Sequence, residues 1–140
     1  MARVDRTEAL AFLESSRVGH LATVRPDGGP HVVPITFART GEVIVTMIDH
    51  KPKSTMRLQR LANIEANPEV SLLVDEWSED WRSLRWVRVD GTALIHERDD
   101  MWRESRMALL AKYDQYRDQP PQGPAIVISI DRVVTWASTR

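Results

Sequence analysis

Apolar and polar residues alternate along six short runs of this chain. In the last run, for example, Ile126, Ile128 and Ile130 occupy every second position. An alternation with a period of two is typical of a strand that buries one face. The pattern therefore predicts six strands, at residues 18–25, 31–38, 42–49, 70–75, 86–95 and 125–136.

Three segments between these runs have the apolar spacing of helices. The first is capped by Thr7 and ends near Gly19, the second lies between Pro52 and the Asn-Pro pair at 67–68, and the third spans about 99–116. Strands that follow one another through short turns favour an antiparallel sheet. We therefore expect a mainly β protein with flanking helices, in which one domain, residues 1–140, forms a six-stranded antiparallel split barrel.

Two residues within the predicted strands indicate irregular pairing. Pro34 has no N–H to donate to a neighbouring strand, so its strand should have a free edge or a break. Gly91 lies inside the fifth run, where an isolated glycine predicts a bulge.

Composition narrows the function classes. The 140 residues carry a formal net charge of −1, which gives little attraction for nucleic acid. The chain has no cysteine, which excludes disulfides and catalysis by a thiol. The first residues lack the apolar segment of a secretory signal, and no stretch approaches the roughly 18 apolar residues of a membrane span. We expect a soluble, cytoplasmic protein without a membrane span.

A window without acidic residues lies between Asp49 and Glu65. It contains four cations and two hydroxyl residues at the expected start of the second helix: Lys51, Lys53, Ser54, Thr55, Arg57 and Arg60. A helix N-terminus flanked by cations is a favourable site for phosphate. The window therefore predicts an anion site, and the alternative is a solvated helix face.

A second window, residues 81–88, combines Trp81 and Trp86 with three arginines. Aromatic rings beside cations suit a flat heterocycle with an anionic tail, and also single-stranded nucleic acid. The alternative is an aromatic cluster buried in a subunit interface.

No residue pattern identifies catalytic groups. The four histidines have no metal-ligand spacing, so we expect no metal, although His31 lies near the expected pocket and could hydrogen-bond a ligand. GxGxxG, GxxxxGK[ST] and GxSxG sequences are absent. Because no carboxylate pair or nucleophile stands out, the catalytic residues are unknown, and a bound cofactor would have to supply the reactivity.

Three segments together resemble a known family. Residues 18–35 resemble the opening hairpin of the pyridoxamine-phosphate-oxidase-like split barrels, and 51–58 with the following strand resemble their phosphate-binding helix. Residues 80–92 resemble those of the subgroup described as probable coenzyme F420-dependent enzymes. The resemblance covers about residues 7 to 136.

The resemblance implies a homodimer with two cofactor sites between its subunits. The cofactor ring would lie along the second and third strands, and the phosphate at the second helix. The residues implied at the cofactor are His31, Val33, Thr46, Met47, Ile48, Lys53, Ser54, Thr55 and Arg57, with Trp81 as an aromatic at the pocket.

The function implied is an F420-dependent reductase that transfers hydride to a small conjugated substrate. One alternative is an FMN-dependent enzyme similar to pyridoxamine-phosphate oxidase. Another is a non-catalytic protein that binds flavin, deazaflavin or haem. A nucleic-acid-binding module is disfavoured by the net charge, and no proton donor is assigned.

Overall fold

The computed structural model describes residues 5–49 and 58–138. Its helices are α1 (Arg6–Ser15), α2 (Gln59–Ala66), α3 (Asp100–Lys112) and α4 (Asp114–Asp118), with a short 3-10 helix η1 (Trp81–Ser83). Its strands are β1 (Gly19–Val24), β2 (Pro30–Ile35), β3 (Ala38–Thr40), β4 (Val43–Met47), β5 (Glu69–Glu76), β6 (Arg85–His96) and β7 (Ala125–Ala137). The expected mainly β protein with flanking helices is confirmed.

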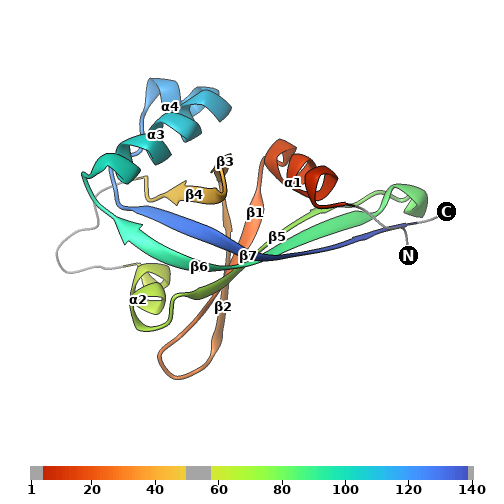
Figure 1. Ribbon diagram of the computed structural model, residues 1–140, viewed down its shortest axis with the longest axis horizontal. Helices are drawn as coiled ribbons and strands as arrows, with labels where there is room; N and C mark the ends of the chain where they lie inside the picture. The colour runs from red at the N-terminus through yellow and green to blue at the C-terminus, as the bar shows by residue number, and fades with distance from the viewer. Residues whose placement is uncertain (1–4, 50–57, 139–140) are drawn as a thin grey trace.

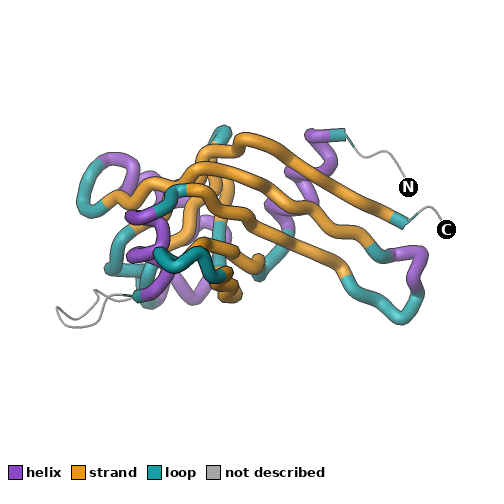
Figure 2. The backbone as a smooth tube through the Cα atoms, turned by 90° about the horizontal axis from the view of Figure 1, so that it is seen from below, coloured by secondary structure: helices purple, strands orange, loops and turns teal. Residues whose placement is uncertain are grey.

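The strands described form one antiparallel sheet in the order β2-β1-β5-β6-β7-β4-β3. The two outermost strands, β2 and β3, are separated in the chain only by Thr36 and Phe37, so the sheet curls until its edges approach each other (Figures 1 and 2). No ladder joins these edges within the residues described. The expected split barrel is confirmed, as an open sheet.

One predicted strand is divided in two. The run at 31–38 becomes β2 and β3, so the sheet has seven strands where the alternation predicted six. Phe37 is the cause, because its backbone N–H and carbonyl bond to the Tyr113 hydroxyl, at 3.2 and 3.1 Å, instead of to a strand. The chain thereby leaves β1 and crosses to β4.

Two irregularities expected from the sequence are confirmed. The strand that contains Pro34 is an edge strand. The ladder between β6 and β7 shifts register at Gly91, because Asp90 is opposite Arg132 whereas Gly91 is opposite Ile130. The extra residue of this bulge, Asp131, lies on β7.

Two helix boundaries differ from the prediction. Asp5 rather than Thr7 caps α1, since its carboxylate accepts the backbone N–H of Glu8 at 2.8 Å. The predicted helix over 99–116 ends at Tyr113 and resumes as α4. This break matters for function because it fixes the direction of Tyr116.

The core lies inside the curled sheet, where α1 and α2 cover it, and a smaller apolar cluster lies under α3. Phe37, Leu72 and Ile126 are completely buried in the main core. Beyond the barrel, β5, β6 and β7 continue together as a long arm that ends at η1 (Figure 2). Within the residues described, no helix is long and apolar enough to cross a membrane.

Candidate functional site

A cleft with a volume of about 350 Å³ opens beside β4, at the junction of β2, α2 and α4. Its apolar lining is Val18, Pro34, Ile35 and Met47. Its polar lining is Thr36, Thr46, Asp49, Arg60 and Tyr116. Ligand pockets in proteins commonly combine an apolar surface with a few convergent polar groups, as this cleft does.

Hydrogen bonds order the polar side of the cleft. The Tyr116 hydroxyl lies 2.6 Å from the Thr36 hydroxyl and 3.2 Å from a carboxylate oxygen of Asp49. Because an ionised carboxylate only accepts, Tyr116 donates to Asp49 and accepts from Thr36. Thr46 donates its own hydroxyl to the Thr36 carbonyl at 2.7 Å.

The neighbouring tyrosine holds this arrangement in place. The Tyr113 hydroxyl lies 2.9 Å from the Arg17 carbonyl and bonds to the backbone of Phe37. Its ring meets the ring of Tyr116 edge-on, with centroids 5.7 Å apart. Tyr113 thus ties the junction of α3 and α4 to the β2–β3 crossing, and Tyr116 is directed into the cleft.

Burial perturbs two ionisable groups here. It lowers the pKa of the Arg60 guanidinium, although Asp49 and Tyr116 act in the opposite direction. It raises the pKa of the Tyr116 hydroxyl, Asp49 raises it further, and the bond from Thr36 opposes both. The Arg60 Nε is buried and has no hydrogen-bond partner among the residues described. The Arg60 guanidinium thus interacts electrostatically with Asp49 but keeps one N–H without a hydrogen-bond acceptor among the residues described.

The structure brings two of the expected cofactor residues into this cleft. Thr46 and Met47 on β4 both line it, and both are buried. Ile48 follows β4 and packs in the main core, with Val33 of β2 against the same core. His31 lies further along β2 and is half-buried, with its Nδ1 buried and without a partner among the described residues.

The other residues expected at the cofactor lie outside the described residues or away from the cleft. Lys53, Ser54, Thr55 and Arg57 lie outside the described residues. Trp81 is in η1 between β5 and β6, at the end of the arm, and is 59% exposed. Figure 1 shows that this end of β5 and β6 is remote from β4. Within one chain, Trp81 does not meet the cleft.

Sequence reasoning missed the polar side of the cleft. Tyr116 is 80 residues from Thr36, and no local pattern connects the two. Arg60 was part of the basic window without being assigned to the cofactor. The chain contains only two tyrosines, three residues apart at the end of a predicted helix, and this pairing was the one available indication.

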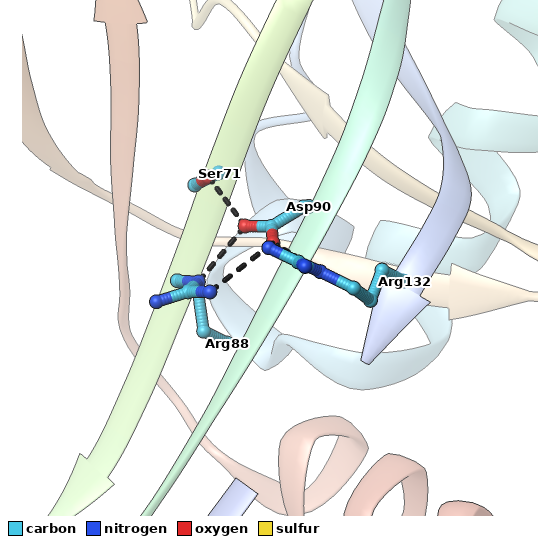
Figure 3. Close-up of polar contacts among 4 residues, drawn as sticks. All are labelled: Ser71, Arg88, Asp90 and Arg132. Atoms are coloured by element: carbon cyan, nitrogen blue, oxygen red, sulfur yellow. Dashed lines mark hydrogen bonds and ion pairs between the residues drawn. The ribbon is translucent and has the colours of Figure 1, made fainter. Parts of the chain in front are cut away.

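A second, larger cleft, of about 720 Å³, lies between the β1–β2 hairpin and strands β5, β6 and β7. Figure 3 shows its most ordered polar group, in which Asp90 accepts from Ser71, Arg88 and Arg132 at 2.7 to 3.2 Å. Both arginines are thus already paired. The cluster joins three adjacent strands, and we interpret it as structural.

This cluster predicts a loss of stability in acid. Partial burial raises the pKa of Asp90, but the hydrogen bonds from Ser71, Arg88 and Arg132 outweigh it and hold the pKa at about 2. A lowered carboxyl pKa stabilises the fold above the unfolded value near 4, and this contribution disappears as the pH falls towards 2. Because the carboxyl is partly solvated, we expect a contribution of about 1 kcal/mol.

Urea unfolding at pH 4.5 and 2.5 measures this contribution. The wild type should lose about 1 kcal/mol more between these pH values than Asp90→Asn, which has no carboxyl to protonate. Asp75→Asn, an exposed carboxylate on the adjacent strand β5, is the control and should behave like the wild type. Equal acid sensitivity of the wild type and Asp90→Asn would show that the cluster does not act in this way.

In the part of the chain described, no three histidine and acidic side chains are grouped so that they could hold a metal ion. The polar side chains that line the cleft, Tyr116, Thr36, Asp49 and Arg60, offer hydrogen bonds and charge to a ligand.

Comparison with known proteins shows which family this chain resembles in sequence and fold. Over 139 residues the chain is 25% identical to the F420H(2)-dependent biliverdin reductase of Mycobacterium tuberculosis, covering 96% of this chain and 93% of that protein. It is 31% identical to a solved F420 reductase, with a TM-score of 0.61, covering 89% of this chain and 94% of the other.

A haem-binding protein from Mycobacterium smegmatis has the same fold, with a TM-score of 0.78 at 21% identity, over 99% of this chain and 57% of the other. The family model described as pyridoxamine 5'-phosphate oxidase matches residues 6–137. Because that match covers almost the whole barrel and its arm, this chain belongs to the pyridoxamine 5'-phosphate oxidase family, whose relatives include F420-dependent reductases.

Proposed function

We propose that this protein is a reductase that uses the deazaflavin F420 and transfers hydride to a small conjugated acceptor. The observation that carries the proposal is the similarity, over nearly the whole chain, to two proteins named for their use of F420. No sequence motif marks out an activated nucleophile or a catalytic acid pair, which also favours chemistry supplied by a cofactor.

The cleft fits part of such a cofactor. A volume of about 350 Å³ is at the lower end of ligand pockets and suits a ring system rather than a whole dinucleotide-sized molecule. Met47 and Ile35 offer an apolar face to a flat heterocycle, whereas Thr36, Thr46 and Arg60 offer polar groups to its edge. When bound, F420 supplies the hydride.

The residues of the chain then bind the cofactor and orient it. In the proposal Thr46 and Met47 contact the ring, and Lys53, Ser54, Thr55 and Arg57 hold the anionic tail, as the family resemblance implies. Arg60 adds a cation whose Nε lacks a partner in the described residues. Cationic side chains and hydroxyl groups at a phosphate would contribute charge-assisted hydrogen bonds.

We further propose that the protein is a homodimer. Trp81 lies at the end of the arm, so it would contact the cofactor only in the cleft of a second copy (Figure 1). Trp77 and Trp81 are 66% and 59% exposed, which is unusual for the largest apolar side chain and is consistent with an interface.

A fluorescence titration of F420 against FMN, in the same buffer, tests the cofactor. We expect F420 to bind more tightly, and its affinity to fall as salt is added, because contacts to an anionic tail are screened. Light scattering on the same sample should give twice the chain mass of 16.0 kDa. Tighter binding of FMN would favour an FMN-dependent enzyme, as the family name suggests, and a mass of one chain would rule out a shared site.

A further inference from the structure

We infer that Tyr116 is the proton donor of this cleft, and that it protonates a conjugated acceptor as hydride is transferred to it. The inference rests on the proposed function and extends it to a residue and a substrate class. Its basis is the position of the hydroxyl, which lines the cleft and lies within hydrogen-bonding distance of Thr36 and Asp49.

The phenolic proton has a defined direction and a connection to solvent. Thr36 donates to the phenolic oxygen at 2.6 Å, so the Tyr116 proton is left for the Asp49 carboxylate at 3.2 Å. Asp49 is exposed. A proton lost from Tyr116 to a bound acceptor can therefore be replaced by water at Asp49, without opening the core.

The other described groups of the cleft are poor donors. Thr46 is a poor donor because a threonine hydroxyl is far less acidic than a phenol. Arg60 keeps its proton because a guanidinium is a very weak acid, even though burial lowers its pKa. Asp49 accepts the hydrogen bond of the Tyr116 hydroxyl, so it is placed as an acceptor rather than a donor.

Electrostatics suits Tyr116 to this role. Burial raises the pKa of the hydroxyl, so the phenol keeps its proton at neutral pH and gives it up only to a strongly basic atom. Among the described residues, the charged and titratable groups that face it are Asp49, which raises the pKa further, Arg60, whose positive charge favours tyrosinate, and the ring of Tyr113.

This chemistry defines the acceptor as a conjugated carbonyl or imine. A new C–H bond forms at the electron-poor carbon with hydride from the reduced deazaflavin, which is oxidised by two electrons and releases its ring proton to water. The displaced electron pair moves to the terminal oxygen or nitrogen, which becomes strongly basic. That atom takes the proton of Tyr116 as the phenolic O–H bond breaks, and water returns a proton to the tyrosinate.

The first test needs no cofactor. Because the chain has two tyrosines, Tyr113→Phe leaves Tyr116 as the sole source of tyrosinate absorbance in an alkaline titration. We expect a midpoint above that of an ordinary tyrosine, and Asp49→Asn in the same background should lower this pKa, since a neighbouring negative charge is removed. If Tyr113→Phe does not fold, the difference between the wild type and Tyr116→Phe gives the same midpoint. A midpoint that does not respond to Asp49→Asn would overturn the relay.

The second test measures turnover with menadione and biliverdin as probe acceptors for F420 reduced beforehand. Tyr116→Phe should lower kcat about 100-fold, as expected when a general acid is lost, with F420 affinity changed less than twofold. Buffer acids should restore part of the rate in Tyr116→Phe alone, because a small acid can replace the phenol. Tyr113→Phe deletes the hydroxyl that orients Tyr116 and serves as the comparison. Buffer acids should not restore any rate that this variant loses, because Tyr116 keeps its own proton.

The outcomes separate the two proposals. No F420 binding by the wild type would overturn the proposed function while the titration of Tyr116 still tests the relay. Two other outcomes would overturn the donor role and leave the cofactor assignment in place. In the first, F420 binds normally and kcat is unchanged in Tyr116→Phe. In the second, the wild type binds F420 but reduces neither probe.

Discussion

Replacing Gly91 with alanine is expected to lower the free energy of unfolding by about 3 kcal/mol. A Cβ at this position would lie 2.3 Å from the Ser129 carbonyl oxygen and 2.7 Å from Cγ2 of Ile128. The first neighbour is backbone, so the strands β6 and β7 would have to separate at the bulge. For a chain of this size, 3 kcal/mol corresponds to a fall of about 10 °C in Tm, measurable by calorimetry.

Gly29→Ala is the appropriate control for this substitution. Its Cβ would meet only the ends of two flexible side chains in the β1–β2 hairpin, those of Asp27 and Arg25, at 3.0 and 3.1 Å. We expect a change below about 1 kcal/mol for this variant, as for most surface substitutions. Equal effects of Gly91→Ala and Gly29→Ala would mean that the bulge adapts to a side chain.

Phe37→Ala is expected to be at least as disruptive, with a loss of about 4 kcal/mol. The ring is completely buried in the main core at the crossing between β2 and β3. The Lys112 ammonium lies 4.0 Å from its centroid, and that nitrogen is buried without a hydrogen-bond partner among the residues described. Removing the ring therefore creates a cavity and leaves the buried ammonium with only the more distant Tyr113 ring, 5.3 Å from its centroid.

Urea unfolding measures the loss in Phe37→Ala, and Phe12→Ala is its control, because these are the two phenylalanines of the chain. Phe12 is half-buried on α1, and its ring contacts the exposed Arg85, so its loss should cost clearly less. A similar loss in both variants would contradict the larger contribution expected from the completely buried ring of Phe37.

The sequence pattern predicts most strands because their alternation is a local property. It does not predict the division of the run at 31–38, because the group that interrupts the ladder is the Tyr113 hydroxyl, 76 residues further along the chain. The break between α3 and α4 has the same origin. Tyr113 commits its hydroxyl to the backbone of Arg17 and Phe37, which no helical periodicity can reveal.

The candidate site was predicted in part for a similar reason. Thr46 and Met47 follow from a family resemblance carried by neighbouring residues, and both line the cleft. Tyr116, Arg60 and Asp49 meet only after folding, because α2, α4 and the end of β4 are brought together by the curled sheet. Trp81 was associated with the same pocket, but it lies in η1 at the end of the arm and does not line the cleft.

The proline in the edge strand has a consequence for how the protein behaves in concentrated solution. The N–H of Arg25 bonds to the carbonyl of Gly29 at 2.8 Å, so these two residues form a hydrogen-bonded pair of the antiparallel ladder. Hydrogen-bonded and non-hydrogen-bonded pairs alternate along such a ladder, so the backbone nitrogens of residues 30, 32 and 34 point away from β1. Two of these three positions are Pro30 and Pro34, so Val32 alone presents an outward N–H there. An edge with a single donor is a poor template for a strand from another molecule, and this barrel can stay open without seeding aggregation through β2.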